Sequence, residues 1–144
     1  SRVEPGQLIT VEWRGMPVWI VRRTEAMIEG LAAQEQRLAD PGSNVASQQP
    51  AYAQNAHRSI KPEFLLLVGI CTHLGCSPAF RPERGPEDLG PTWTGGFFCA
   101  CHGSLFDLAG RVFRGVPAPT NMVVPPHMYL SDSRILIGEE EGAA

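Results

Sequence analysis

The chain has 144 residues, which is enough for one domain with its own core, and its apolar content of 43% is that of a globular protein rather than a disordered one. Its formal net charge of −3, without any run of basic residues, argues against a nucleic-acid partner. Neither a signal peptide nor an apolar stretch long enough to cross a bilayer is recognisable in these residues.

The first segment of the chain predicts a β-hairpin. Residues 7–13 alternate between polar and apolar side chains, as a half-buried strand does, and residues 17–22 form a second, more apolar strand. The dipeptide Arg14-Gly15 between them suits a tight turn. Pro17 has no backbone N–H to donate, so it should lie at the start of the second strand or on a sheet edge.

A single helix should follow the hairpin. Thr24 is a suitable N-cap, and the sequence Asp40-Pro41-Gly42 would end the helix. One helical face would be apolar and consist of Met27, Ile28, Leu31 and Leu38. Residues 43–59 lack a clear periodicity and are rich in Gln, Asn, Ser and Ala, so we expect a surface insertion there, with Tyr52 as its anchor.

The rest of the chain predicts short strands separated by turns. Residues 64–70 form a continuous apolar run, which we interpret as a central strand, and residues 96–98 form another strand. Between them, residues 81–93 are a polar excursion with several prolines. Two further hairpins are expected, the first from strands at 105–107 and 111–113 and the second from strands at 128–130 and 135–137. Residues 139–144 should form an acidic tail. The pattern as a whole predicts an all-β, antiparallel fold with one helix.

The four cysteines fall in two short clusters, and each cluster contains one histidine. The clusters read CTHLGC at 71–76 and CACHGS at 99–104. Cys and His at close spacing indicate a metal site, which could hold tetrahedral zinc or a two-iron cluster in which two histidines replace two cysteines on one iron. Each cluster offers one short Cys-to-His step, which favours the two-iron arrangement. His57 and His127 lie outside the clusters and should be surface or structural residues.

These clusters, together with the sequence GVPAP at 115–119, resemble the soluble domain of the Rieske iron–sulfur proteins of bacterial cytochrome bc1 complexes, the ubiquinol–cytochrome c reductases. The resemblance is strongest over residues 64–129 and weak over residues 1–59. It implies that residues 1–144 form a single Rieske domain, in which a small cluster-binding subdomain at about 69–118 is inserted in a larger β base.

The resemblance also implies a role for each residue of the two clusters. Four residues would ligate one [2Fe-2S] cluster per chain, with thiolates on the inner iron and imidazoles on the outer iron: Cys71, Cys99, His73 and His102. The two other cysteines, Cys76 and Cys101, would form a disulfide between the loops. The Ser104 hydroxyl would donate a hydrogen bond to a bridging sulfide, and residues 117–119 would cover the cluster.

Three positions depart from the family pattern. Many members have a tyrosine whose hydroxyl bonds a cysteine sulfur where this chain has Phe106, and the missing hydroxyl argues against the highest cluster potentials. Ala100 stands where proline is frequent, and Val116 is an additional residue in the proline segment. Neither of these two should change the site much.

The donor set explains the expected chemistry. Two ferric ions, two sulfides and two thiolates form a neutral cluster, which accepts an electron more readily than the dianion that four thiolates would form. Potentials are therefore roughly −150 to +300 mV, against about −400 mV for plant-type ferredoxins. Electron uptake should be coupled to proton uptake at the imidazoles of His73 and His102, which suits the oxidation of a quinol.

We therefore expect an electron-transfer subunit of a ubiquinol–cytochrome c reductase; this chain alone would be an electron carrier. His102 would be the catalytic residue that takes a proton from ubiquinol, and the electron would pass to cytochrome c1. Leu74 and His102 would dock against cytochrome b. Family members are held in a dimeric membrane complex by an N-terminal transmembrane helix and a hinge, which this chain lacks. The disulfide implies the oxidising, periplasmic side of the bacterial inner membrane.

Two other functions remain open on the sequence. A soluble Rieske-type ferredoxin that serves an oxygenase would carry a similar cluster at a low potential. The pair Cys76 and Cys101 argues against it, because such ferredoxins usually lack that disulfide. A structural zinc module would be colourless, whereas a Rieske protein is red-brown.

Overall fold

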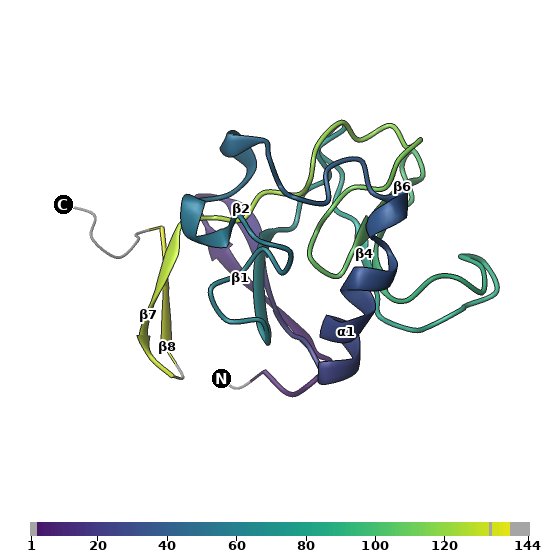
Figure 1. Cartoon of the computed structure of the whole chain (residues 1–144). Helices are drawn as coiled ribbons and strands as arrows, with labels where there is room; N and C mark the ends of the chain where they lie inside the picture. The colour runs from purple at the N-terminus through teal and green to yellow at the C-terminus, as the bar shows by residue number, and fades with distance from the viewer. Residues whose placement is uncertain (1–2, 133, 139–144) are drawn as a thin grey trace.

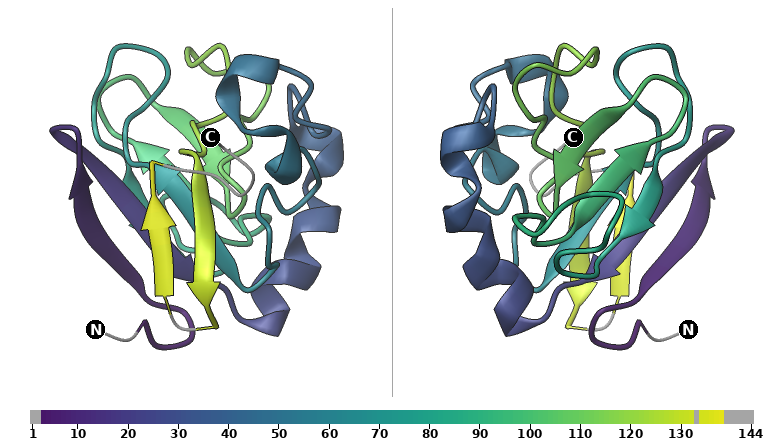
Figure 2. Two further views of the ribbon diagram at one scale, coloured as in Figure 1. Left: turned by 90° about the vertical axis from the view of Figure 1, so that its left-hand side faces the viewer. Right: turned by 90° about the vertical axis from the view of Figure 1, so that its right-hand side faces the viewer.

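The computed structural model describes residues 3–132 and 134–138, where strands dominate (Figures 1 and 2). Within these residues the α-helix α1 spans Glu25–Ala33, and 3₁₀ turns lie at Glu35–Arg37, Ala46–Gln48 and Ala51–Ala53. The strands are β1 (Leu8–Trp13), β2 (Met16–Arg22), β3 (Phe64–Val68), β4 (Ala79–Arg81), β5 (Gly96–Cys99), β6 (Ser104–Asp107), β7 (His127–Ser131) and β8 (Arg134–Ile137). The predicted antiparallel β fold with one helix is confirmed. No helix of the described ranges has the length and apolar character that a bilayer span requires.

The first sheet has the strand order β1-β2-β3 and includes the predicted hairpin, which turns at Arg14-Gly15. Strand β3 lies at the edge of this sheet, so the prediction of a central strand over 64–70 is wrong. The backbone of an irregular segment covers its end, because Val68 N donates to Val123 O at 2.8 Å. The apolar run therefore reflects burial of both faces of β3 rather than a central position in the sheet.

The second sheet, β4-β5-β6, lies against the first. The ring of Trp19 on β2 stacks on that of Phe97 on β5, with centroids 5.2 Å apart, and this contact joins the two sheets. Gly69, directly after β3, passes under the Trp19 indole so closely that a Cβ atom would overlap the ring. Only glycine therefore lets the chain run from β3 past this aromatic contact into the first Cys-His cluster.

Helix α1 lies along one side of the sheets (Figure 2) and begins as predicted, because the Thr24 hydroxyl oxygen accepts a hydrogen bond from Met27 N at 3.2 Å. It ends earlier than predicted, at Ala33. The side chain of Gln34, the C-cap residue, donates to Thr92 O and to Thr94 Oγ1, which fixes the chain where it leaves the helix. Leu38, expected on the apolar helical face, instead bridges to Phe113 and is fully buried.

Residues 43–59 pack more deeply than a surface insertion would. Five of these residues are buried, namely Ser43, Gln49, Ala53, Arg58 and Ser59. Their polar groups find partners inside the protein; for example, Gln49 Nε2 donates to Ser43 O and Val45 O, each at 3.0 Å. Tyr52 anchors the segment as predicted, because its hydroxyl oxygen accepts from His127 N at 2.9 Å. His127 is buried, which agrees with a structural role.

The predicted hairpins near the end of the chain have different outcomes. The last one is confirmed as β7 paired with β8, while Ser133 and the tail at 139–144 lie outside the described residues. The one predicted over 105–113 is only partly present, because β6 is followed by the single bridge of Val112 with Phe106.

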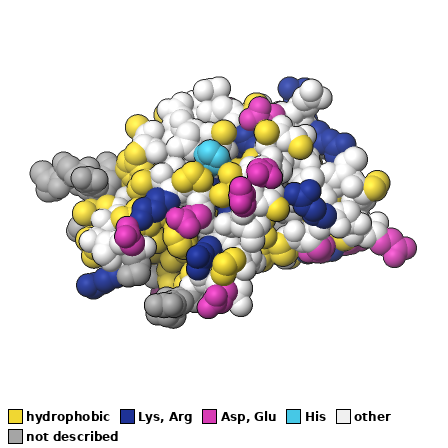
Figure 3. All heavy atoms as spheres, turned by 60° about the horizontal axis from the view of Figure 1, so that its bottom comes forward, with side chains coloured by type: hydrophobic (Ala, Val, Ile, Leu, Met, Phe, Trp, Pro, Cys, Tyr) yellow, Lys and Arg dark blue, Asp and Glu magenta, His cyan; other side chains and the backbone are white. Residues whose placement is uncertain are grey.

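Residues 82–95 project from the molecule as a long loop (Figure 1). On the face that Figure 3 shows, side chains of both charge signs are interspersed.

Candidate metal centre

Each Cys-His cluster forms a short turn at the end of a buried strand. The first turn follows β3 and is closed by Cys71 N, which donates to Cys76 O at 2.6 Å. The second follows β5 and is closed by Gly103 N, which donates to Cys99 O at 2.8 Å. Two separate strands thus deliver the two predicted loops to one end of the molecule, where they meet.

The two cysteines predicted as ligands lie inside the protein as free thiols. Cys71 is 3% exposed and Cys99 is 1% exposed, and both belong to the main apolar core. Burial raises the pKa of the Cys99 thiol, and the neighbouring Cys71 raises it further. A metal binds the thiolate and not the thiol, so metal binding here must release protons.

The two histidines lie side by side and are more exposed than these thiols. The rings of His73 and His102 are 4.6 Å apart between centroids and meet edge to face. His73 is half-buried and His102 is exposed. The Nδ1 atom of His73 is buried and has no hydrogen-bond partner, although a buried ring nitrogen is costly to leave unpaired. A metal ion on Nδ1 would satisfy this atom and leave Nε2 for the surface.

The pairing of the two remaining cysteines is confirmed: Cys76 and Cys101 form a disulfide across 25 residues. It ties the tips of the two loops together. The sulfur atoms of Cys76, Cys99 and Cys101 all lie within 4.8 Å of one another. Two of these three are bonded to each other and cannot act as thiolate ligands, which leaves Cys71 and Cys99 as the free cysteines.

The proline segment covers the loops through two hydrogen bonds. Ala118 N donates to the Ser104 hydroxyl oxygen at 3.0 Å, and the Thr72 hydroxyl donates to Thr120 O at 2.6 Å. Ser104 was expected from the sequence, but Thr72 was not; its only signal in the sequence is its position between Cys71 and His73. Phe106 is fully buried in the same core as Cys71. Leu74, at the tip of the first loop, is 69% exposed.

The donor set fits a Rieske [2Fe-2S] cluster. It combines two buried thiols, two adjacent imidazoles with an unpaired inward nitrogen, and a serine hydroxyl whose proton is still free to donate. A cleft of about 700 Å³ lies elsewhere, between the first sheet and the β7–β8 hairpin, and none of the predicted ligands lines it. We give it no part in the function, because a redox centre held by loops does not need a substrate cleft at the base.

Comparisons with known proteins agree with this assignment. A family model described as "Rieske [2Fe-2S] domain" matches residues 1–126. The chain is 60% identical over its full length to the ubiquinol-cytochrome c reductase iron-sulfur subunit of Allochromatium vinosum and covers 69% of that protein. It is 41% identical over 138 residues to the mitochondrial Rieske subunit of the cytochrome b-c1 complex of Zea mays, and it covers 43% of that chain.

A solved structure is also similar. A chain of a "Hyperthermophilic respiratory Complex III" superposes on this fold with a TM-score of 0.56 at 22% sequence identity. The match covers 93% of the present chain and 67% of the other. At this identity the likeness concerns the fold alone.

Proposed function

Because the chain belongs to the Rieske [2Fe-2S] domain family, we propose that it is the electron-transfer part of a ubiquinol–cytochrome c reductase. The full-length match to a bacterial iron–sulfur subunit supports this proposal. The chain spans about two thirds of that relative and less than half of the maize one, so the activity of the whole protein comes to this chain by inference.

We propose the ligands residue by residue. Cys71 and Cys99 hold the inner iron, which agrees with their burial. His73 and His102 hold the outer iron, and the orphaned Nδ1 of His73 is the observation that supports this orientation most directly. Residues 69–118 act as the cluster-binding subdomain, because they include both loops, all of the second sheet and the cover at Ala118.

When bound, the cluster takes up and releases one electron at a high potential. The protein supplies the surroundings for this step. Ser104 Oγ accepts from Ala118 N, so its own proton is left to donate to a sulfide and stabilises added negative charge. The buried core around Cys71 and Cys99 excludes water from the inner side.

The observation that carries the proposed function is the exposure of the His102 imidazole beside His73, at the one end of the molecule where the two loops meet. There His102 accepts a hydrogen bond and then a proton from ubiquinol. The exposed Leu74 supplies an apolar contact next to it for docking to cytochrome b. The electron passes on to cytochrome c1. The disulfide supports a place on the oxidising, periplasmic side of a bacterial membrane complex.

The midpoint potential measured against pH tests this proposal. On the purified, red-brown protein, we expect a high potential that falls as the pH rises through weakly alkaline values, because electron uptake carries a proton with it. A low potential that stays flat over this range would contradict the proposal and support the ferredoxin alternative. A second test uses the assembled complex: a His102 variant that keeps its cluster should lose quinol oxidation, and full activity would contradict the role of His102.

A further inference from the structure

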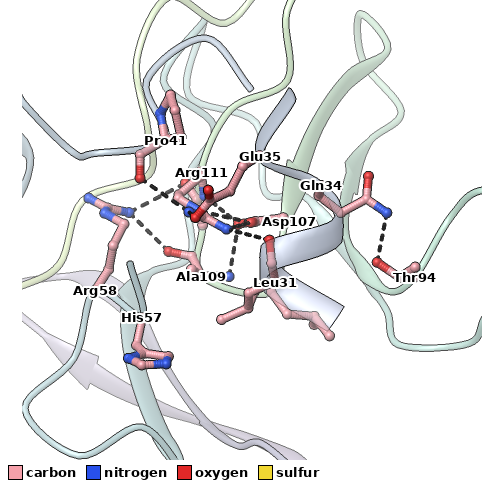
Figure 4. Close-up of polar contacts among 12 residues, drawn as sticks. Leu31, Gln34, Glu35, Pro41, His57, Arg58, Thr94, Asp107, Ala109 and Arg111 are labelled. Carbon is pink, nitrogen blue, oxygen red and sulfur yellow. Dashed lines mark hydrogen bonds and ion pairs between the residues drawn. The ribbon is translucent and has the colours of Figure 1, made fainter. Parts of the chain in front are cut away.

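Three arginines are buried together between α1, the segment 43–59 and the turn after β6. Arg23 is 2% exposed, and Arg58 and Arg111 are completely buried. Figure 4 shows Arg58 and Arg111 with their partners around Asp107. Charged side chains of this length are almost never fully buried unless they are paired. We call Arg23, Arg58 and Arg111 the guanidinium cluster.

The guanidinium cluster carries more positive charge than the buried carboxylate beside it neutralises. Asp107 is the only buried carboxylate of the described residues, and it accepts from Arg111 Nε at 2.8 Å. Glu35 lies 3.6 Å from Arg111, but its side chain is 48% exposed. Burial lowers the pKa of both Arg23 and Arg58 to about 10, so both stay charged at neutral pH. Three guanidinium groups thus share one buried carboxylate, and the other two carboxylates near them are the exposed Glu35 and the half-buried Asp40, which interacts with Arg58.

Most of the remaining donors go to uncharged acceptors, which are main-chain carbonyls and the side chains of Ser59 and Gln49. Arg23 donates to Leu108 O at 2.9 Å, and Arg58 donates to Ala109 O at 3.1 Å. These carbonyls belong to the turn that follows β6. Arg58 holds its place with a backbone φ of 53°, a conformation that is unfavourable for a residue with a Cβ atom. The backbone of Arg58 is thus strained at the same buried place where the charges of the guanidinium groups are incompletely neutralised.

The guanidinium cluster lies behind the proposed metal centre, at the far end of β6. This strand begins at Ser104, which pairs with Cys99, and ends at Asp107, which pairs with Gly96. Three residues of strand correspond to about 10 Å. The space between is filled by core side chains without exposed surface, among them Phe97, Phe106 and Val112. Water therefore does not screen the field of the arginines along this path.

We propose that the guanidinium cluster raises the reduction potential of the [2Fe-2S] cluster by stabilising the electron that it receives. This inference rests on the proposed function, because it concerns the same redox step. The arginines touch neither the ligands nor a substrate; they act through the field and by fixing β6, and are positioning residues. At an effective dielectric constant of about 20 and a distance of about 12 Å, one charge changes the reduction equilibrium about tenfold. For one electron this equals about 59 mV.

Two substitutions of opposite charge effect test the inference. Arg58→Gln removes a positive charge and keeps an amide donor, whereas Asp107→Asn removes the opposing negative charge and keeps the acceptor for Ala109 N and Arg111 N. Optical redox titration at one pH, on protein whose EPR spectrum confirms an intact cluster, should show the equilibrium constant about tenfold lower in the first variant and about tenfold higher in the second. Damage to the fold alone would not move the two potentials in opposite directions.

Two controls complete the test. Arg84→Gln removes a guanidinium group on the exposed loop and should leave the potential unchanged within about twofold, because water screens it. Arg58→Lys keeps the positive charge, so its reduction potential should stay close to that of the wild type. This comparison holds even if Arg58→Gln incorporates little of the [2Fe-2S] cluster. The inference is overturned if both charge variants shift the same way, or shift no more than Arg84→Gln, or if Arg58→Lys falls as far as Arg58→Gln. A low, pH-independent wild-type potential would instead refute the proposed function and leave these comparisons valid.

Discussion

At the scale of single residues, the proposed metal centre includes polar atoms that could form one more hydrogen bond or metal bond than they do. The inward Nδ1 of His73 is unpaired, and the Ser104 hydroxyl accepts from Ala118 N while its own proton remains available. Both atoms belong to the loops that we propose to hold the cluster. At these two residues, unused hydrogen-bonding capacity therefore adds to the evidence from residue type.

Ser104→Ala should affect both the fold and the redox centre. The buried Ala118 N–H would lose its acceptor, which costs about 1–3 kcal/mol, and the cluster would lose a donor, which lowers its potential. Urea unfolding and redox titration measure the two effects. Ser47→Ala, at an exposed serine, should change neither. A Ser104 variant with a wild-type potential would show that the hydroxyl does not reach the cluster.

Phe106→Tyr should raise the potential. Phe106 is fully buried in the core that contains Cys71 and Cys99, so a hydroxyl there that reaches a cysteine sulfur would stabilise the reduced form. A hydrogen bond worth about 1.4 kcal/mol would change the reduction equilibrium about tenfold. Redox titration decides the matter, with Phe106→Leu as the control without a hydroxyl. An unchanged or lowered midpoint in Phe106→Tyr would contradict the prediction.

At the scale of elements, segments held by main-chain contacts are hard to place from the sequence. The segment 43–59 has a polar composition that suggests solvent exposure, yet two of its polar side chains are buried. Arg58 donates to the distant carbonyl of Ala109, and Gln49 donates to the carbonyl of Ser43 within the segment. Its attachment to β7 through Tyr52 is of the same kind.

Tyr52→Phe should destabilise the protein by about 1–3 kcal/mol, because the backbone N–H of His127 would lose the hydroxyl acceptor that lies at 2.9 Å. Tyr129→Phe is the matched control: the Tyr129 hydroxyl is buried without a hydrogen-bond partner, so its removal should be neutral or stabilising. Urea unfolding of both variants measures the difference. Equal losses in the two variants would mean that the Tyr52 contact has no special weight.

The buried imidazole of His127 should make stability depend on pH. Burial lowers its pKa, so the folded protein keeps His127 neutral where the unfolded chain, with an ordinary value near 6.5, takes up a proton. Stability should therefore be complete above about pH 6.5 and fall as the pH decreases below it, by at most about 1.4 kcal/mol per pH unit. His127→Gln should flatten this slope in urea unfolding between about pH 7 and pH 5. A slope as steep as that of the wild type would contradict the assignment.

The sequence predicts the chemistry of the site better than the arrangement of the elements. Cys71, His73, Cys99 and His102 could be named because their spacing is local. The position of β3 at a sheet edge could not, because burial by an irregular segment and burial by a neighbouring strand produce the same apolar pattern. The end of α1 depends on Gln34 and its contact with Thr94, sixty residues away. Such long-range contacts leave no periodic signal.

At the scale of the whole molecule, the disulfide and the cluster both tie the two loops, so their contributions should overlap. A crosslink across 25 residues is worth about 3.5 kcal/mol in the chain-entropy model. The double variant Cys76→Ser, Cys101→Ser should lose about this much in cluster-free protein and clearly less when the cluster is bound. Urea unfolding of both forms measures this. An equal loss in both forms would show that the disulfide acts by packing and not by constraint.

The thiols are buried and the imidazoles are near the surface, and this difference affects the route of electron transfer. Cys71 and Cys99 lie behind a thick apolar wall, while His102 lies at the surface. Because electron tunnelling weakens steeply with distance, electron transfer through the apolar core would be slow. Electrons should therefore enter and leave at the surface near the two imidazoles. If electrons enter and leave at His102, as we propose, the electron donor and the electron acceptor would have to bind the same surface one after the other.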